Sequence, residues 1–323
     1  MGVLSNGLAP LTVSANRIVS TATGAPVLLR GVNRSGMEYS EPDEEGFASA
    51  AGISRHEVRW ICREWKANIL RIPLNQDWAL NGRAGRPAED YLRDIDRIIL
   101  LASTYGAYTL LDLQWLDAET AFGSGRQFVS PLPNHSSPAF WTLLARRYRD
   151  EPAVLFDILN EPHDRLPNDP HPLPHHGGGF YPASQRRVSP LEWQPWARKL
   201  IAAIRAEHPA ALVWVSGVNW GYDLRGVPMD DVPNLVYSTH VYRNKGETRA
   251  EWAEAFGRLA LGRPVFAAEW GGPDADLDWG RRLASYLQEL GMGWCAWSWA
   301  DKPHLVTRYA PTRFGDLVRS RVG

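Results

Sequence analysis

Short, continuous runs of apolar residues alternate along this chain with longer segments in which apolar residues recur every three or four positions. A continuous apolar run is typical of a strand buried on both faces of a parallel sheet, and the spaced pattern is typical of an amphipathic helix. Eight such strands are expected, at residues 27–33, 69–73, 108–112, 154–159, 212–216, 235–240, 264–268 and 293–297.

The segments between these strands carry helical spacing. Helices are expected at residues 54–65, 89–105, 137–148, 190–206, 248–261, 276–290 and 312–322. Ser54 and Glu57 have the spacing of a capping box at the start of the first helix. The connection around residues 223–232 is expected to be short and irregular, and a small hairpin is expected before the first strand.

The alternation of strands and helices determines the expected fold class. Eight strands, each followed by a connection, predict an α/β protein with a (β/α)8 TIM barrel and a short N-terminal β-hairpin, rather than an open doubly wound sheet. The first strand is not followed by the glycine-rich fingerprint of a dinucleotide fold. No linker divides the chain, so residues 1–323 are expected to form a single barrel domain.

Charge and cysteine content exclude several classes of function. Lys+Arg 35 against Asp+Glu 36 gives a net charge of −1 without any basic block, so neither nucleic acid nor a membrane is expected as a partner. The N-terminus lacks the pattern of a secretory signal, which leaves the compartment open. Cys62 and Cys295 form no metal motif and are expected to be buried free thiols.

Polar and aromatic residues gather where the expected strands end. In a barrel of parallel strands the carboxyl ends share one rim, and reactive groups lie there. The residues at this rim are Asn33, Arg34, Arg71, Asp112, Gln114, Asn160, Glu161, Asn219, Trp220, His240, Tyr242, Glu269, Trp270, Trp297 and Trp299.

Two of these residues, Glu161 and Glu269, each follow an apolar run, where a carboxylate is costly to desolvate. Two carboxylates that face each other across a barrel mouth can cleave a glycosidic bond, one as proton donor and one at the anomeric centre. The 15 Trp residues fit such a substrate, because sugar rings stack on aromatic planes. The alternative is that one or both glutamates are structural and pair with arginine.

Four short motifs lie at or near the strand ends: Asn68-Ile-Leu-Arg71-Ile-Pro73, Asn160-Glu161-Pro162, His240-Val-Tyr242 and Glu269. Together they resemble glycoside hydrolase family 5 of clan A, which includes the cellulases and related β-glycanases. The matching positions run from Leu29 to Trp297, which is nearly the whole chain.

The resemblance implies a role for each matching residue. Glu161 would be the general acid/base and Glu269 the nucleophile. Arg71 and Tyr242 would hold Glu269 ionised, and His240 would lie beside Glu161 and help to set its proton affinity. In the same pattern Asn160 would bind the sugar 2-hydroxyl, and Trp297 would stack on the sugar next to the nucleophile.

One position departs from the family pattern. At the end of the third strand the family usually carries His after Asp-Leu, whereas this chain carries Gln114. Glutamine can bond a sugar hydroxyl but cannot titrate near neutrality, so the identity of the sugar at the central subsite is left open.

Further aromatic residues are expected beside Trp297. Trp220 and Trp299 are plausible sugar platforms, as are Trp115 and Tyr39. The tryptophans on the expected helices are interpreted as core residues: Trp60, Trp65, Trp141, Trp196 and Trp252.

A long segment rich in Pro, His and Gly, residues 163–188, directly follows Glu161 and is expected to wall one side of the cleft. Its histidines, His171, His175 and His176, lack the spacing of a zinc site. Neither a metal nor a cofactor is expected.

The resulting hypothesis is a retaining β-glycoside hydrolase, an endo-β-1,4-glucanase that acts as a monomer on a β-linked polysaccharide or oligosaccharide. The resemblance makes secretion plausible. A β-mannanase and an exo-acting β-glucosidase or β-mannosidase remain as alternatives with the same mechanism. From a different class, a non-catalytic carbohydrate-binding barrel remains, although such a barrel would not need both glutamates together with Arg71 and Tyr242.

Overall fold

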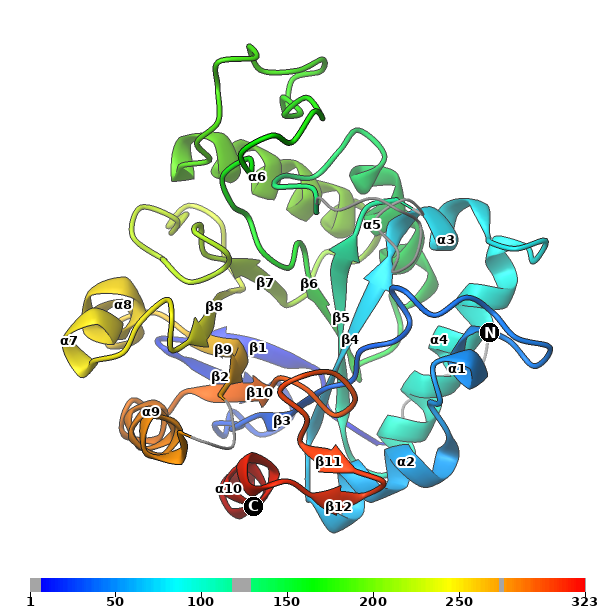
Figure 1. Ribbon diagram of the computed structural model, residues 1–323, viewed down its shortest axis with the longest axis vertical. Helices are drawn as coiled ribbons and strands as arrows, with labels where there is room; N and C mark the ends of the chain where they lie inside the picture. Colours follow the sequence, from blue (N-terminus) through cyan, green and yellow to red (C-terminus); the bar gives the residue numbers. More distant parts are fainter. Residues whose placement is uncertain (1–6, 118–128, 273–275, 323) are drawn as a thin grey trace.

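A closed barrel of eight parallel strands forms the centre of the molecule (Figure 1). The computed structural model describes residues 7–117, 129–272 and 276–322. The strands follow one another around the barrel in chain order: β3 (Arg30–Asn33), β4 (Ile69–Asn75), β5 (Tyr108–Trp115), β6 (Val154–Asp157), β7 (Val213–Ser216), β8 (Leu235–Tyr242), β9 (Val265–Gly271) and β10 (Gly293–Ala296). This arrangement confirms the predicted (β/α)8 barrel.

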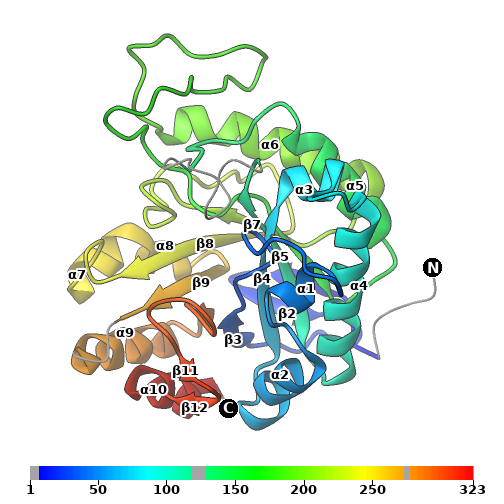
Figure 2. The same cartoon turned by 45° about the vertical axis from the view of Figure 1, so that its right-hand side comes forward.

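Helices surround the barrel on its outside (Figure 2). They are α1 (Phe47–Ala50), α2 (Arg55–Arg59), α3 (Gln76–Asn81), α4 (Ala88–Thr104), α5 (Ser137–Arg147), α6 (Pro190–Glu207), α7 (Arg249–Trp252), α8 (Arg258–Ala260), α9 (Leu277–Glu289) and α10 (Arg313–Val322), with π-helical turns η1 (Trp60–Glu64) and η3 (Ala253–Gly257). The connection between β7 and β8, residues 217–234, contains no helix, so it is irregular as predicted but not short. None of the described helices is both long enough and apolar enough to cross a membrane.

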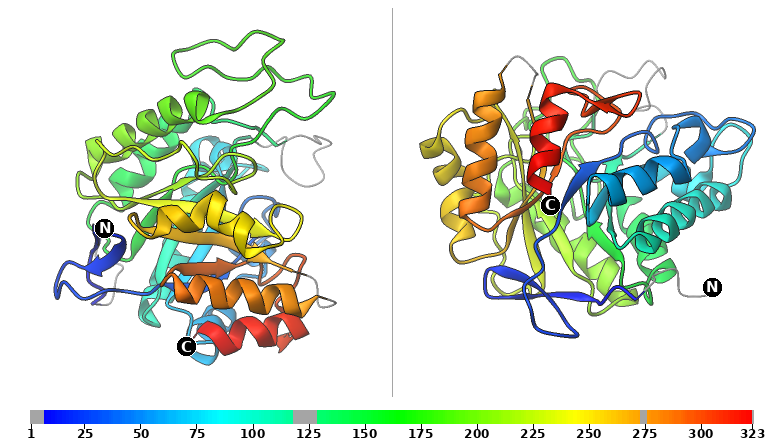
Figure 3. Two further views of the ribbon diagram at one scale, coloured as in Figure 1. Left: turned by 90° about the vertical axis from the view of Figure 1, so that its left-hand side faces the viewer. Right: turned by 90° about the horizontal axis from the view of Figure 1, so that it is seen from below.

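The N-terminal hairpin closes one end of the barrel. Strands β1 (Leu11–Ser14) and β2 (Arg17–Ser20) pair antiparallel, which confirms the predicted hairpin. Leu11 packs into the cluster of side chains inside the barrel. The hairpin crosses the face at which the strands begin (Figure 3). The opposite end, where the strands finish, is therefore the end that can receive a ligand.

Most of the tryptophans fill the layer between the strands and the helices. Trp65, Trp141, Trp196 and Trp252 are fully buried there, which confirms their interpretation as core residues. Trp60 is only partly buried and packs against the edge of this core, with its ring against His56 and Tyr309. Both cysteines are buried free thiols, as expected.

The capping box predicted at Ser54 is only half formed. The Ser54 hydroxyl accepts a hydrogen bond from the backbone N–H of Glu57 at 3.2 Å. The Glu57 carboxylate does not return the bond but pairs with the buried guanidinium of Arg34, at 2.5 and 3.0 Å. An unpaired, buried Arg34 guanidinium would cost more free energy than a half-formed helix cap. The Glu57 carboxylate therefore pairs with Arg34.

The strands that carry the rim residues run further than the apolar runs predicted. Strand β5 continues to Trp115, β8 to Tyr242 and β9 to Gly271. Gln114, His240 and Glu269 therefore stand on strands rather than on loops, although the register shifts at Gln114 and between Ala267 and Glu269. The sequence did not predict α1, α3 or the small hairpin of β11 (Val306–Thr307) and β12 (Ala310–Pro311).

Candidate active site

A cavity of 670 Å³ opens at the carboxyl ends of the strands. Arg71 and His240 lie fully buried beside it. The residues that line the cavity are Gln114, Asn160, Glu161, Asn219, Trp220, Tyr242, Asn244, Lys245, Glu269 and Trp297. Most of the residues singled out in the sequence therefore meet at one place.

The two glutamates lie side by side in this cavity, although they are far apart along the chain. Glu161 follows β6, and Glu269 belongs to β9. One carboxylate oxygen of each, together with a ring nitrogen of His240, lie within 4.8 Å of one another. The Glu161 side chain is 17% exposed and that of Glu269 is 5% exposed, so Glu161 is the more accessible of the two.

Both oxygens of Glu269 are held by donors. Arg71 Nη1 donates to Oε1 at 3.0 Å, and the Tyr242 hydroxyl donates to Oε2 at 2.7 Å. Hydrogen bonds to a charged group are short and strong, so the carboxylate is fixed in orientation. These are the contacts that the family resemblance implied for Arg71 and Tyr242.

Arg71 ties this part of the site together. Its Nε donates to Asp157 Oδ2 at 2.9 Å, Nη1 donates to Asn33 Oδ1 at 2.8 Å, and Nη2 donates to Asn160 Oδ1 at 3.0 Å. Asp112 Oδ1 lies 3.0 Å from Nη2 without meeting hydrogen-bond geometry. The guanidinium therefore joins four neighbouring strand ends into one rigid unit.

The carboxyl groups around Arg71 exceed what one cation can neutralise. Burial opposes the charge of Arg71, but Asp112, Asp157 and Glu269 outweigh it and raise the pKa of the guanidinium. Burial raises the pKa of Asp112 well above its usual range and that of Asp157 to about 6. Sequence reasoning missed the role of Asp157; the available signal was a charged residue in a strand that is buried throughout.

His240 lies between the two glutamates. Its Nδ1 is 3.0 Å from Glu161 Oε1 and 3.6 Å from Glu269 Oε2. Burial lowers the pKa of His240 to about 3, so the ring is neutral near pH 7 and can donate only one proton. Gly221 has φ +72°, and a Cβ there would lie 2.8 Å from His240 Cγ, so only glycine fits against the ring.

Lys245 also reaches Glu161, which the sequence did not predict. Its Nζ donates to Glu161 Oε1 at 2.9 Å and to the backbone oxygen of Trp220. The same ammonium lies 5.2 Å from the centre of the Tyr242 ring. No periodicity marks this residue, because it lies in a turn directly after β8.

The predicted aromatic platforms divide into two groups. Trp297 and Trp220 are partly buried and line the cavity, and Trp220 lies flat on the His163 ring, 3.7 Å away at 12°. Trp115 and Tyr39 lie against each other with ring centres 5.9 Å apart, and neither lines the cavity.

Trp299 is not a sugar platform, contrary to the prediction. It is 3% exposed and packs on Trp65 with ring centres 5.0 Å apart. The chain after Trp297 turns back towards the helix layer, so the next tryptophan completes the hydrophobic core.

Gln114 lines the cavity with an unsatisfied acceptor. Its Oε1 is buried and has no hydrogen-bond partner among the residues that the structure describes. A buried amide oxygen without a partner is costly, so a ligand that donates a hydrogen bond there would relieve the cost.

The segment 163–188 does not wall the cavity, contrary to the prediction. Apart from His163 beneath Trp220, it extends over α6 (Figure 1), where Trp196 donates to the backbone oxygen of Pro174. Its histidines do not converge on one point. Within the described ranges, the group with suitable atoms for a metal is Glu161, His240 and Glu269. The ammonium of Lys245 on the same Glu161 oxygen does not suit a second cation.

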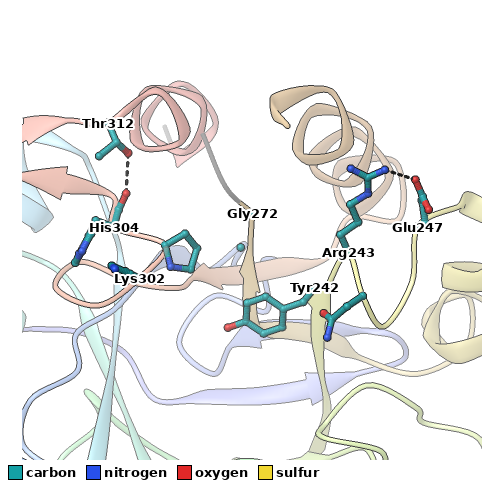
Figure 4. Close-up of a pocket in the computed structure, with 10 residues that line it drawn as sticks. Tyr242, Arg243, Glu247, Gly272, Lys302, His304 and Thr312 are labelled. Carbon is teal, nitrogen blue, oxygen red and sulfur yellow. Dashed lines mark hydrogen bonds and ion pairs between the residues drawn. The ribbon is translucent and has the colours of Figure 1, made fainter. Parts of the chain in front are cut away.

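A larger cavity of 860 Å³ lies beyond Tyr242 (Figure 4). It shares Tyr242 and Asn244 with the first cavity, but neither Glu161 nor Glu269 lines it. At its edge Arg243 pairs with Glu247 at 2.6 Å. Its larger volume does not make it the reaction centre, because it lacks paired carboxylates.

Comparison with known protein families gives one match over most of the chain. The family described as Cellulase (glycosyl hydrolase family 5) matches residues 20–303. Endoglucanase N of Pectobacterium atrosepticum is 23% identical over 316 residues, covering 93% of this chain. Endoglucanase A of Butyrivibrio fibrisolvens is 27% identical over 309 residues, covering 90% of this chain. The chain spans 60% of the length of each of these two relatives.

Solved structures share the fold. A β-glucanase from Saccharophagus degradans in complex with cellotetraose superimposes with a TM-score of 0.75 at 20% identity, covering 98% of this chain and 94% of that one. The catalytic domain of a Thermobifida fusca endoglucanase gives a TM-score of 0.70 at 18% identity, covering 99% of both chains.

Proposed function

The chain belongs to glycosyl hydrolase family 5, and from that premise we propose that it is an endo-β-1,4-glucanase that hydrolyses its substrate with retention of anomeric configuration. One observation carries the proposal: an oxygen of Glu161 and an oxygen of Glu269 lie within 4.8 Å of each other. Retaining enzymes hold their two carboxyl groups ~5–5.5 Å apart, whereas inverting enzymes need ~6.5–9.5 Å to admit a water molecule.

In the first step Glu161 donates its proton to the glycosidic oxygen while a Glu269 oxygen attacks the anomeric carbon. The bond from that carbon to the leaving oxygen breaks, and an ester between the sugar and Glu269 forms. Arg71 and Tyr242 hold the attacking carboxylate in place before the reaction.

In the second step Glu161 accepts a proton from a water molecule, and the water oxygen attacks the same carbon. The ester bond to Glu269 breaks, and the sugar leaves with its original configuration. The neutral ring of His240 lies against Glu161 throughout and cannot itself replace it as the acid.

Substrate contacts follow from groups that the structure leaves available. Because Arg71 bonds the Asn160 oxygen, the Asn160 amide nitrogen is the group that would donate to a sugar hydroxyl. Trp297 offers a stacking face, and Gln114 offers its unpaired oxygen. The choice of glucan is supported by relatives named endoglucanase and by a structural neighbour bound to cellotetraose. Residues 1–323 then act as one catalytic barrel domain.

The test is a product profile on a panel of β-glucans and β-mannans, with the first-formed anomer followed by NMR. The proposal predicts internal cleavage of β-1,4-glucan and initial release of the β-anomer. Initial release of the α-anomer would contradict the mechanism. Preference for mannan or release from chain ends would correct the substrate, and binding without release would indicate a carbohydrate-binding barrel.

A further inference from the structure

Lys245 has contacts that the two-glutamate mechanism does not explain. Its side chain is only 14% exposed, and its Nζ lies 2.9 Å from Glu161 Oε1. We propose that Lys245 is a positioning residue that fixes which oxygen of Glu161 exchanges the proton and sets the pH range in which Glu161 works. This inference rests on the proposed function.

The geometry distinguishes the two oxygens of Glu161. Oε1 receives both Lys245 Nζ, at 2.9 Å, and His240 Nδ1, at 3.0 Å. Within the described parts of the chain, no hydrogen bond reaches Oε2. Because the Lys245 ammonium can only donate, Oε1 acts as an acceptor and Oε2 is left as the oxygen that carries the proton to the substrate.

The ammonium of Lys245 is itself held in place. It donates to the backbone oxygen of Trp220 and lies over the face of the Tyr242 ring. The backbone of Lys245 is fixed by a turn, because its N–H donates to the Tyr242 oxygen at 2.9 Å. A long, flexible side chain gains a defined position only through several such contacts.

The charged and titratable groups of the site come from several elements. They are Arg71 on β4, Asp112 on β5, Asp157 on β6, His163 after β6, His240 and Tyr242 on β8, Lys245 after β8 and Glu269 on β9. Burial lowers the pKa of His163 and that of His240, so both rings are neutral near pH 7. Arg71 contacts Glu269 rather than Glu161. Among the described residues, Lys245 is therefore the cation in direct contact with Glu161.

This cation balances the charge of the two glutamates in both halves of the reaction. Before the reaction Glu269 is negative, Glu161 is protonated and Lys245 is positive. In the covalent intermediate the Glu269 ester is neutral, Glu161 is negative and Lys245 is still positive. The sum over these three groups is zero in both states, so Lys245 stabilises Glu161 as a base without a change in net charge.

The test is the pH dependence of Lys245→Met on a soluble β-1,4-glucan. Removing the cation favours protonated Glu161, so the alkaline limb of kcat/KM should move about one pH unit upward. With a dinitrophenyl cellobioside, whose leaving group needs no proton, the acidic limb of kcat should move upward as well. Lys245→Arg keeps the charge and should restore the wild-type position of both limbs.

Lys66→Met is the matched control. Lys66 is exposed and precedes β4, at the end of the barrel opposite the cavity. It carries the same change in charge and should leave both limbs in place. Lys245→Gln is a second uncharged variant. The test is valid if either Lys245→Met or Lys245→Gln still unfolds cooperatively on heating.

Two failures can be distinguished. If the wild-type protein hydrolyses β-glucan but both limbs stay in place in Lys245→Met and Lys245→Gln, the role of Lys245 is refuted and the proposed function stands. If the wild-type protein releases no sugar from any β-glucan or β-mannan, the proposed function itself is refuted.

Discussion

At the scale of single residues, Glu269 depends on two donors that come from different strands. Arg71 on β4 reaches one carboxylate oxygen, and Tyr242 on β8 reaches the other. The two donors differ in how they can be tested. Arg71 also bonds Asn33, Asn160 and Asp157, so its removal would disturb the whole unit, whereas the Tyr242 hydroxyl bonds Glu269.

Tyr242→Phe should therefore lower kcat by roughly 10- to 100-fold, because a hydrogen bond to a charged group contributes about 1.5–3 kcal/mol. Steady-state kinetics on a soluble β-glucan will measure the loss. Tyr148→Phe is the matched control, since its buried hydroxyl donates to Asp96 at 2.8 Å away from the cavity. Equal losses in the two variants would argue against a special role for Tyr242.

His240 predicts a dependence of stability on pH. Its pKa is lowered to about 3 in the folded protein, against ~6.5 when unfolded, so the unfolded chain binds the extra proton first. Its contribution to stability is fully present above pH ~6.5 and is lost as pH falls towards 3. His240→Asn should therefore lose less unfolding free energy than the wild type between pH 7 and 4.5.

Urea denaturation at both pH values will measure this difference. His56→Gln is the control, because His56 is exposed and lies outside the cavity. If His240→Asn and the wild type lose the same free energy on acidification, His240 does not have the neutral, buried state described here.

The predictability of the site also differs residue by residue. Glu161, Glu269, Arg71 and Tyr242 could be placed because they fall at strand ends, and a barrel brings strand ends together. Lys245 could not, because its contact depends on a turn after β8 that no hydrophobic pattern encodes. Trp299 was misplaced for a related reason: strand spacing does not report which way the chain turns once the strand has ended.

At the scale of elements, the sequence located every barrel strand but shortened several of them. An apolar run ends where side chains become polar, whereas β8 continues through His240 to Tyr242 because its backbone still pairs with β9. Hydrophobic spacing also predicted one continuous helix where η1 and η3 insert π-helical turns. Spacing of 3.6 residues cannot reveal such local changes.

The N-terminal hairpin gives a prediction at this scale. Leu11 on β1 packs into the interior of the barrel, so Leu11→Ala should lower the unfolding free energy by about 2–4 kcal/mol. Activity at 25 °C should stay near wild type, because the hairpin closes the end of the barrel opposite the glutamates. Chemical denaturation and kcat/KM will measure the two effects.

Leu191→Ala is the control for this substitution. Leu191 is 81% exposed at the start of α6, so the same change should cost little stability. A fall in kcat/KM of Leu11→Ala without unfolding would show that the two ends of the barrel are coupled.

At the scale of the whole molecule, the barrel converts distance along the chain into proximity. Glu161 follows β6 and Glu269 lies on β9, and β7 and β8 separate these two strands in the barrel. Arg71 on β4 contacts both Asp157 on β6 and Glu269 on β9. We predict that the protein is active as a monomer, which light scattering at assay concentration will check.

The most direct test of the central claim is covalent labelling with a dinitrophenyl cellobioside that carries fluorine beside the anomeric carbon. The good leaving group allows the ester to form, and the fluorine slows its hydrolysis, so the intermediate accumulates. Peptide mapping by mass spectrometry should find the sugar on Glu269 in the wild-type protein and no adduct in Glu269→Gln. An adduct on Glu161, or labelling that persists in Glu269→Gln, would contradict the assignment of the two glutamates.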